Sequence, residues 1–267
     1  MRSIYRLEKI MNRKYFYIVT AIILPTLLLS ACNLPDRVTA ESTIPDANSV
    51  ASLSTPTPVP SLCDNLYFPN TPGDTWEYAG NTSATGAYTR TDSITNLGVD
   101  SLTVQSTVSG SSYNVDYSCT PAGLIAVNPI QQYLGPVLDA LNGQVSLNLT
   151  SNSGITLPKS INPGDSWQQI IEWEGSAQGM STNGRLVIDY TAAGYESVSV
   201  PSGTYDALKV NTSIRIEISN FRIQYGTYEI TSWMAPNVGI IKSQGSSNVP
   251  NVQFSDSLEL NQYSPAP

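Results

Sequence analysis

The 267-residue chain contains no histidine, only three cysteines and only 13% charged residues. The absence of histidine excludes Ser-His and Cys-His nucleophilic systems and zinc sites that use imidazole ligands. The sequence also lacks a calcium-binding loop, a phosphate-binding loop and a dinucleotide-binding glycine pattern. We therefore expect no catalytic residue, no metal site and no cofactor. The remaining candidate for an enzyme is a hydrolase that uses a carboxylate pair, with Glu172 and Glu174 as its residues.

Basic residues are scarce beyond residue 31. Five of the 13 Lys and Arg residues and one of the 21 acidic residues precede Cys32, so residues 32–267 carry 8 basic and 20 acidic side chains and a net charge of −12. Nucleic acids and anionic head groups are bound by clusters of Lys and Arg. The charge therefore argues against nucleic acid as a partner.

Residues 1–31 have the three parts of a cleavable secretion signal. Basic residues come first, an apolar run of 15 residues extends from Tyr15 to Leu29, and small residues follow. A transmembrane helix, the alternative, needs roughly 17–25 residues. Leu29-Ser30-Ala31-Cys32 resembles the lipobox of bacterial lipoproteins. This resemblance implies a diacylglycerol thioether on Cys32, usually a further acyl chain such as palmitate on its amine, and a place on the extracytoplasmic face of a cell membrane or outer membrane.

The chain after Cys32 divides by composition into a linker and one domain. Residues 32–62 lack apolar periodicity and include Ser-Thr-Pro-Thr-Pro-Val-Pro-Ser. Such a segment buries too little apolar surface to offset its ordering entropy, and alternating proline extends it. We expect a disordered spacer over 32–62, a single domain over 63–263 and a short tail over 264–267.

The domain alternates apolar and polar residues, with glycine, proline, asparagine and serine between the runs. A period of two predicts antiparallel strands with one face in contact with water. Its high content of Ser, Thr, Asn, Tyr and Val is typical of secreted β proteins. The expected strands are 75–78, 87–97, 101–108, 113–119, 124–127, 144–149, 167–174, 184–195, 205–218, 222–233, 238–244 and 252–260.

One segment departs from this period. Between residues 130 and 142 the apolar residues follow helical spacing. Pro136 fits the first turn of a helix and Gly143 fits its end. We expect one short helix here, which either completes the core or covers a ligand cavity.

A five-residue pattern occurs twice, 91 residues apart. Pro72-Gly73-Asp74-Thr75-Trp76 matches Pro163-Gly164-Asp165-Ser166-Trp167. Pro-Gly-Asp favours a turn, and each tryptophan then begins a strand. The pattern predicts two pseudo-repeated halves, 63–150 and 158–263, with Trp76 and Trp167 as buried anchors.

Two cysteines remain after Cys32. Cys63 and Cys119 form an even pair in an oxidising compartment, which predicts a disulfide between them. The alternative is a nucleophilic thiol, which needs a basic neighbour that the sequence does not show.

Three stretches of the domain resemble poorly characterised bacterial lipoproteins of the TapB-like and DUF3108-like kind. They are Leu66–Tyr78 with its Phe-Pro…Gly…Trp…Tyr pattern, Val200–Val210 and Trp233–Lys242. The resemblance implies an antiparallel, strongly curved sheet or half-barrel around a hydrophobic interior, similar to lipoprotein carriers and lipocalins. It supplies no catalytic residues. Candidates for the lining of such a cavity are Trp76, Leu134, Leu138, Trp167 and Trp233.

We therefore predict a mainly β lipoprotein that binds without catalysis. The acyl anchor holds it on membrane lipid, and the domain binds either a hydrophobic small molecule or an envelope protein. A structural or assembly module without a small ligand is the first alternative, and the carboxylate-dependent hydrolase is the second.

Overall fold

A computed structural model gives the fold. It describes residues 61–83, 85–129, 145–177, 180–218, 223–248 and 255–267. The expected signal, Cys32, most of the linker and the expected helix with Leu134 and Leu138 lie outside the described residues. Among the described residues, no helix is long and apolar enough to cross a membrane.

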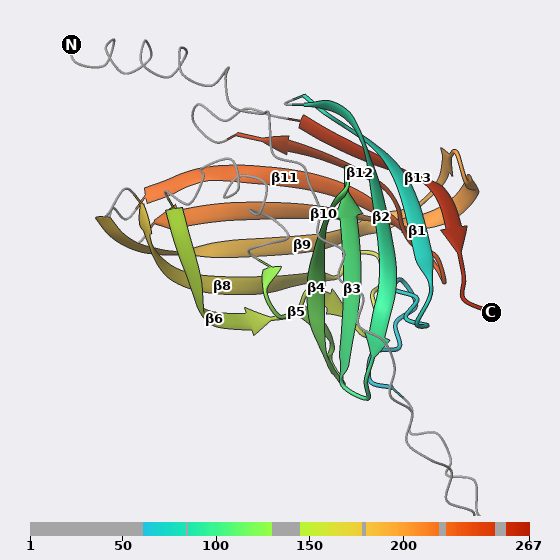
Figure 1. Cartoon of the computed structure of the whole chain (residues 1–267), viewed down its shortest axis with the longest axis horizontal. Helices are drawn as coiled ribbons and strands as arrows, with labels where there is room; N and C mark the ends of the chain where they lie inside the picture. The colour runs from blue at the N-terminus through green and yellow to red at the C-terminus, as the bar shows by residue number, and fades with distance from the viewer. Residues whose placement is uncertain (1–60, 84, 130–144, 178–179, 219–222, 249–254) are drawn as a thin grey trace, which may run out of the picture. The chain divides into compact units, whose positions relative to one another are not determined.

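The described residues form a single antiparallel sheet, shown in Figure 1, which confirms the mainly β fold. Its 13 described strands lie in the order β6-β8-β9-β10-β11-β12-β13-β1-β2-β3-β4-β5-β7. The expected strands are present, most of them longer than expected. The bounds are β1 Thr75–Thr82, β2 Gly86–Leu97, β3 Ser101–Val108, β4 Ser111–Thr120, β5 Gly123–Ala126, β6 Val145–Gly154, β7 Leu157–Pro158, β8 Ser166–Ala177, β9 Met180–Val200, β10 Gly203–Ile218, β11 Ile223–Ala235, β12 Gly239–Ser247 and β13 Ser255–Ser264.

The alternation of the sequence assigns one face of the sheet to the interior. In β1, Trp76, Tyr78 and Gly80 are buried and the residues between them are exposed. In β10, Leu208, Val210 and further alternate residues are buried in the same way. Successive side chains of a strand point to opposite faces, so the apolar set forms one continuous concave face.

The sheet curls until strands from its two ends approach each other. The Asn152 amide of β6 donates a hydrogen bond to the Ala126 carbonyl of β5, 2.7 Å away. The Gln169 amide of β8 donates to the side-chain oxygen of Asn152 at 2.9 Å. Gln169 is fully buried and also accepts a hydrogen bond from Thr156 at 2.8 Å. We call these two ends of the sheet, β6, β8 and β9 on one side and β4, β5 and β7 on the other, its arms. The amides supply hydrogen bonds to buried backbone and side-chain groups where the two arms meet.

The expected disulfide joins Cys63 to Cys119 of β4, and both residues are buried. It closes a loop with a sequence separation of 56 residues. In the chain-entropy model such a cross-link adds about 4 kcal/mol to stability, chiefly by restricting the unfolded chain. The Leu62 amide also donates to the Val99 carbonyl at 2.8 Å, so the segment before β1 is fixed to the β2–β4 region.

The two copies of the Pro-Gly-Asp pattern form turns with the same hydrogen bonds. Asp74 accepts from the backbone amide of Thr71 at 3.0 Å, and Asp165 accepts from that of Asn162 at 2.7 Å. Each tryptophan then stacks on a tyrosine of a neighbouring strand, Trp76 on Tyr263 and Trp167 on Tyr190. The shared turn chemistry explains the shared sequence, while duplication of whole halves stays a prediction.

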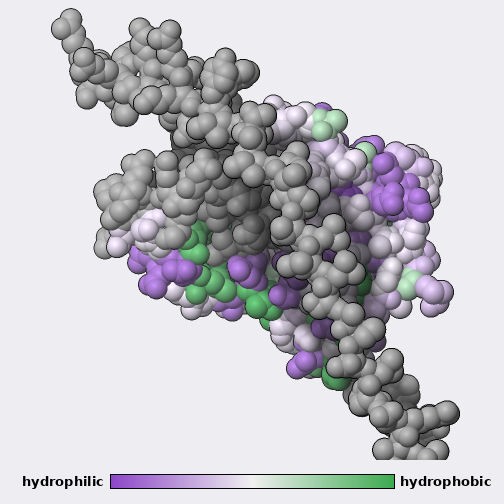
Figure 2. Space-filling view, viewed as in Figure 1, coloured by the Kyte–Doolittle hydropathy of each residue, from purple (hydrophilic) through white to green (hydrophobic). Residues whose placement is uncertain are grey.

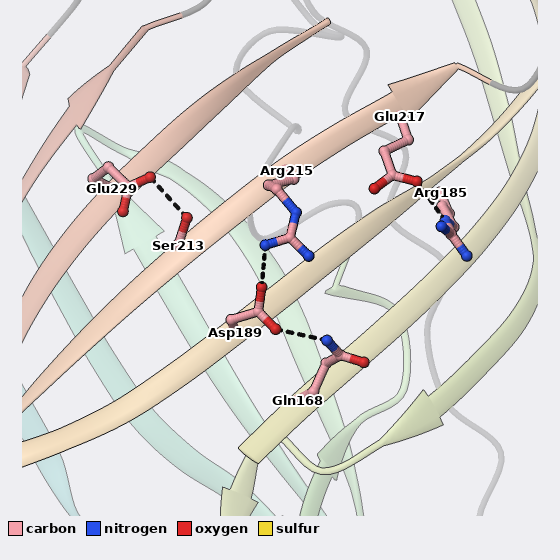
Figure 3. A network of polar contacts seen from close by, with 7 residues as sticks. All are labelled: Gln168, Arg185, Asp189, Ser213, Arg215, Glu217 and Glu229. Atoms are coloured by element: carbon pink, nitrogen blue, oxygen red, sulfur yellow. Dashed lines mark hydrogen bonds and ion pairs between the residues drawn. The ribbon is translucent and has the colours of Figure 1, made fainter. Parts of the chain in front are cut away.

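The convex face of β8–β11 carries charged and polar residues. Figure 3 shows the Asp189 carboxylate between Arg215 and Gln168, with Arg185 paired to Glu217 beside them. Ser213 donates to Glu229 on the next strand at 2.7 Å. Cross-strand pairs of this kind stabilise a solvated sheet face by a few tenths of a kcal/mol to about 1 kcal/mol each.

Candidate functional site

The concave face encloses a cavity of about 620 Å³. Most of its wall is aromatic or aliphatic, and it is formed by both arms of the curled sheet. Trp167 and Tyr190 contribute from β8 and β9, and Leu124 and Leu157 contribute from β5 and β7. Further apolar lining residues are Phe68, Tyr117, Val210, Ile230, Met234 and Leu258. Both the volume and the lining are typical of sites that bind small apolar molecules.

A group of polar residues on the middle strands forms another part of the same wall. It consists of Tyr88, Arg90, Tyr228 and Asp256, which we call the polar cluster. The Tyr88 hydroxyl donates to both carboxylate oxygens of Asp256, at 3.0 and 3.2 Å. β13, which carries Asp256, lies at the centre of the strand order, between β12 and β1. The polar cluster therefore lies on the part of the sheet farthest, in strand order, from the two apolar arms.

Two glycines allow the tyrosines of the polar cluster to lie over neighbouring strands. A Cβ on Gly80 would lie 2.1 Å from Cζ of Tyr88, and a Cβ on Gly245 would lie 2.3 Å from the hydroxyl of Tyr228. Glycine inside a strand often marks such a close approach. Gly245 is paired with Asp256 in the ladder, so both rings lean toward the strand that carries the carboxylate.

Arg90 is the cation of the polar cluster, and its charge is already paired. Its Nε and Nη2 atoms each lie 2.8 Å from a different carboxylate oxygen of Asp92. Burial opposes the charged form of Arg90, but Asp92 more than offsets this effect, and the pKa of the guanidinium is raised. Arg90 therefore stays charged, and it is bound to Asp92 in bidentate geometry.

Burial governs the ionisation of the other members of the polar cluster. It raises the pKa of Asp256 above its ordinary value, although Tyr88 and Arg90 act in the opposite direction. Burial, together with the charge of Asp256, raises the pKa of Tyr228 to about 12. The same two causes raise the pKa of Tyr88. Both tyrosines are therefore neutral near pH 7 and keep their hydroxyl hydrogens.

The structure places one of the described candidate lining residues in the cavity wall and two elsewhere. Trp167 lines the cavity. Trp76 does not: it is buried under the β11–β12 turn, where its Nε1 donates to the Val238 carbonyl at 2.6 Å. Trp233 does not either, because its neighbours Ser232 and Met234 face the cavity and it points to the opposite face.

On the convex face, Trp233 serves the packing of charged side chains. The ammonium groups of Lys209 and Lys242 lie 5.4 and 5.9 Å from its ring centroid. Its Nε1 donates to the carboxylate of Glu196. The two lysine side chains over the indole, together with the hydrophobic core cluster to which Trp233 belongs, keep it buried. The expectation that Trp76 and Trp233 line the cavity was wrong.

The carboxylate pair considered for a hydrolase lies on an exposed face. Glu172 and Glu174 are both exposed in β8, on the side opposite to buried Trp173. Within the described ranges, no group of three or more Cys, Asp or Glu residues is arranged to hold a metal ion. Neither glutamate reaches the cavity wall described above.

Large apolar residues are exposed at several places on the described surface. Figure 2 shows them, on the part of this face that is not grey, as small groups among hydrophilic residues. The large apolar side chains with substantial exposure are Leu62, Leu66, Val99, Val127, Leu149, Tyr195 and Ile240. Single exposed apolar residues are normal on soluble domains, whereas a docking surface needs a contiguous patch.

Comparison with known proteins finds one sequence family that matches part of the chain and solved structures that resemble it. Residues 146–257, which include most of the wall contributed by β8–β12, match the sequence model of the DUF3108-like family. Two of the three motif stretches that carry the resemblance, Val200–Val210 and Trp233–Lys242, lie inside the match, while Leu66–Tyr78 precedes it. The TapB-like part of the resemblance stays a prediction.

Solved structures with 10–17% sequence identity also match the chain, and the first of them shares its fold. A candidate lipoprotein from Parabacteroides distasonis is 17% identical with a TM-score of 0.51, over 76% of this chain and 99% of that one. An exported protein with a YmcC-like fold from Bacteroides fragilis is 15% identical with a TM-score of 0.47, over 76% and 100%. The hypothetical lipoprotein YmcC of Escherichia coli is 10% identical with a TM-score of 0.34, over 74% and 86%. No curated protein sequence matches the chain.

The polar cluster was not predicted from the sequence. Arg90 and Asp92 are two residues apart in a strand and therefore share a face, and Gly80 and Gly245 lie inside strands. These features indicate an inward-facing ion pair and two close approaches only when the facing of each strand is known. The facing of Asp256 can likewise be inferred only from its strand. Leu258 and Leu260, two and four residues later, lie in the interior, so Asp256 is on the same face.

Proposed function

We propose that this domain binds a hydrophobic small molecule in its concave cavity, without catalysing a reaction. The observation that carries the proposal is the cavity of about 620 Å³ between two apolar arms of one sheet. Transfer of a ligand's apolar surface from water into such a wall contributes about 25 cal/mol per Å². Pockets of roughly 300–1,000 Å³ accommodate small organic ligands.

The proposal includes an acyl anchor on Cys32 and a place on the extracytoplasmic face of a membrane. The lipobox-like sequence supports this location, and so does the disulfide between Cys63 and Cys119. Disulfides form and persist chiefly in oxidising compartments outside the cytoplasm. The anchor holds the cavity near a membrane, which is the main reservoir of apolar small molecules in a cell.

Binding of an envelope protein is the alternative that the surface supports less well. It requires a contiguous exposed apolar or charged area, and on the coloured part of the face in Figure 2 apolar residues form only small groups among hydrophilic ones. The hydrolase alternative requires converging carboxylates, and Glu172 and Glu174 are exposed outside the cavity. We therefore favour a small ligand over both.

Native mass spectrometry of the full-length protein tests this proposal. The protein is extracted with its surrounding membrane into polymer-bounded nanodiscs, so that no detergent competes for the cavity. We expect a non-covalent adduct that is lost in Ser232→Phe, because Ser232 lines the cavity. Thr231→Phe, the matched control, changes the neighbouring residue on the opposite face and should retain the adduct. An adduct that survives Ser232→Phe, or none in the wild type, would contradict the proposal.

A further inference from the structure

The cavity wall has an uneven charge distribution. Its charged lining residues are Arg90 and Asp256, and Arg90 is bound in bidentate geometry to Asp92. In the part of the chain that the structure describes, no lysine or arginine forms an ion pair with Asp256. The charge of Asp256 is therefore the one that the described wall leaves without a cation.

Asp256 also has fewer hydrogen bonds than a carboxylate can accept. Its described hydrogen bonds come from the Tyr88 hydroxyl, which is shared between both oxygens, and from the backbone of Ser257. A carboxylate offers about four acceptor positions. A half-buried carboxylate with open acceptor positions gains most from a group that donates hydrogen bonds. It disfavours an anion, because like charges in a poorly solvated site repel each other strongly.

The placement of the cluster relative to the apolar arms fits an elongated molecule. Along β11 both Tyr228 and Met234 line the cavity, and six residues of a strand span about 20 Å. The carboxylate lies on the middle strands, while Trp167 and Leu124 lie on the two arms. A molecule with one polar and one apolar end can therefore place its polar end at Asp256 and its apolar end between the arms.

We propose that the ligand is a single-chain amphiphile whose head group donates hydrogen bonds to Asp256 and carries no negative charge. This inference rests on the proposed function. A monoacylglycerol or an alkylamine has such a head group, whereas a fatty acid or an anionic phospholipid does not. The tyrosines that lean over Gly80 and Gly245 fix the sides of the head-group position, and Asp256 forms its floor.

The test compares three ligands that share one tail and differ in their head groups. Monolaurin, dodecylamine and laurate are titrated calorimetrically at neutral pH into the full-length protein in phosphatidylcholine nanodiscs, and the heat of empty nanodiscs is subtracted. We expect monolaurin and dodecylamine to bind at least about tenfold more tightly than laurate, which corresponds to about 1.4 kcal/mol. Laurate that binds as tightly as monolaurin would overturn the head-group proposal.

Two variants identify the residue responsible. Asp256→Asn removes the charge and should bring laurate to within about threefold of monolaurin, while Asp189→Asn on the convex face should leave the preference unchanged. Tyr88→Phe removes the competing donor and should increase the preference for monolaurin. A preference that persists unchanged in Asp256→Asn would contradict the assignment to Asp256. Failure of all three ligands to bind the wild type would instead overturn the proposed function itself.

Discussion

The Tyr88 hydroxyl reaches across strand β1 to donate a hydrogen bond to Asp256 of β13, 3.0 Å away. The ring can lie over β1 because Gly80, its partner in the ladder, has no side chain. The absence of a side chain at Gly80 therefore allows Tyr88 and Asp256, two of the four members of the polar cluster, to form their hydrogen bond. The consequences for stability can be measured separately from those for binding.

Gly80→Ala should destabilise the fold by about 1–3 kcal/mol, because the new methyl group would overlap the Tyr88 ring and displace it. The measurement is denaturant unfolding, combined with Tyr88→Ala in a double-mutant cycle. Once the ring is gone, alanine in a strand should be neutral or stabilising relative to glycine by about 0.5–1 kcal/mol. Additive effects of the two substitutions would contradict the close approach.

Asp256 should make stability depend on pH in a defined direction. Burial raises its folded-state pKa above the ordinary value of 3.8, so the folded protein binds this proton more tightly than the unfolded chain does. The stabilisation that comes from this tighter proton binding is fully present when the pH is below the ordinary pKa, and it is lost as the pH rises through the folded-state pKa. Asp256→Asn should therefore be more stable than the wild type near pH 7, and the difference should disappear in acid. A difference that does not change with pH, in paired unfolding curves, would refute the raised pKa.

The pair of Arg90 and Asp92 should be far more sensitive to truncation than a surface pair. Arg90→Met leaves the Asp92 carboxylate, with a side chain only 12% exposed, without its bidentate partner. We expect a loss of about 3–5 kcal/mol in unfolding free energy, and recovery of most of it in Arg90→Met/Asp92→Leu. Arg185→Met, which breaks an exposed pair with Glu217, should cost at most about 1 kcal/mol. Equal losses at the two arginines would be inconsistent with a buried pair.

The two Pro-Gly-Asp turns should differ in their contribution to stability despite their common hydrogen bonds. Asp74 is buried and accepts backbone hydrogen bonds from Thr71 and Ala266, whereas Asp165 is exposed. Asp74→Ala removes a buried acceptor from two part-buried backbone amides and should cost about 2–3 kcal/mol, and Asp165→Ala about 0.5–1 kcal/mol. Thermal and denaturant unfolding of both variants measure this difference. A larger loss for Asp165→Ala would contradict the assignment of Asp74 as the buried turn residue.

Much of the fold could be predicted from local sequence, because alternation along each strand is a local property. The Val200–Val210 stretch shows this: Pro201 and Ser202 connect β9 to β10, and Leu208 and Val210 then alternate into the interior. The two-residue strand β7 was not predicted, since Leu157 and Pro158 have no alternation of their own and pair with β5 only through the curl of the sheet.

The candidate site was harder to predict because it depends on which way each strand faces. Trp233 is an aromatic residue of the kind that lines apolar cavities, yet Ser232 and Met234 occupy the concave side. Trp233 is paired in the ladder with Lys209 and Lys242, whose ammonium groups lie over its ring. Tyr88, Arg90 and Asp256 come together only when β1, β2 and β13 become neighbours. A sequence pattern gives the period of a strand but not the identity of its partners.

Quenching of Trp167 fluorescence by a monoacylglycerol with a brominated tail tests the central claim most directly, because Trp167 lies in the apolar wall and Trp76 and Trp233 lie elsewhere. The full-length protein in nanodiscs should show saturable quenching, and Trp167→Phe should lose most of it while Trp233→Phe retains it. Quenching that is unchanged in Trp167→Phe, or that never saturates, would show that the tail does not enter the cavity.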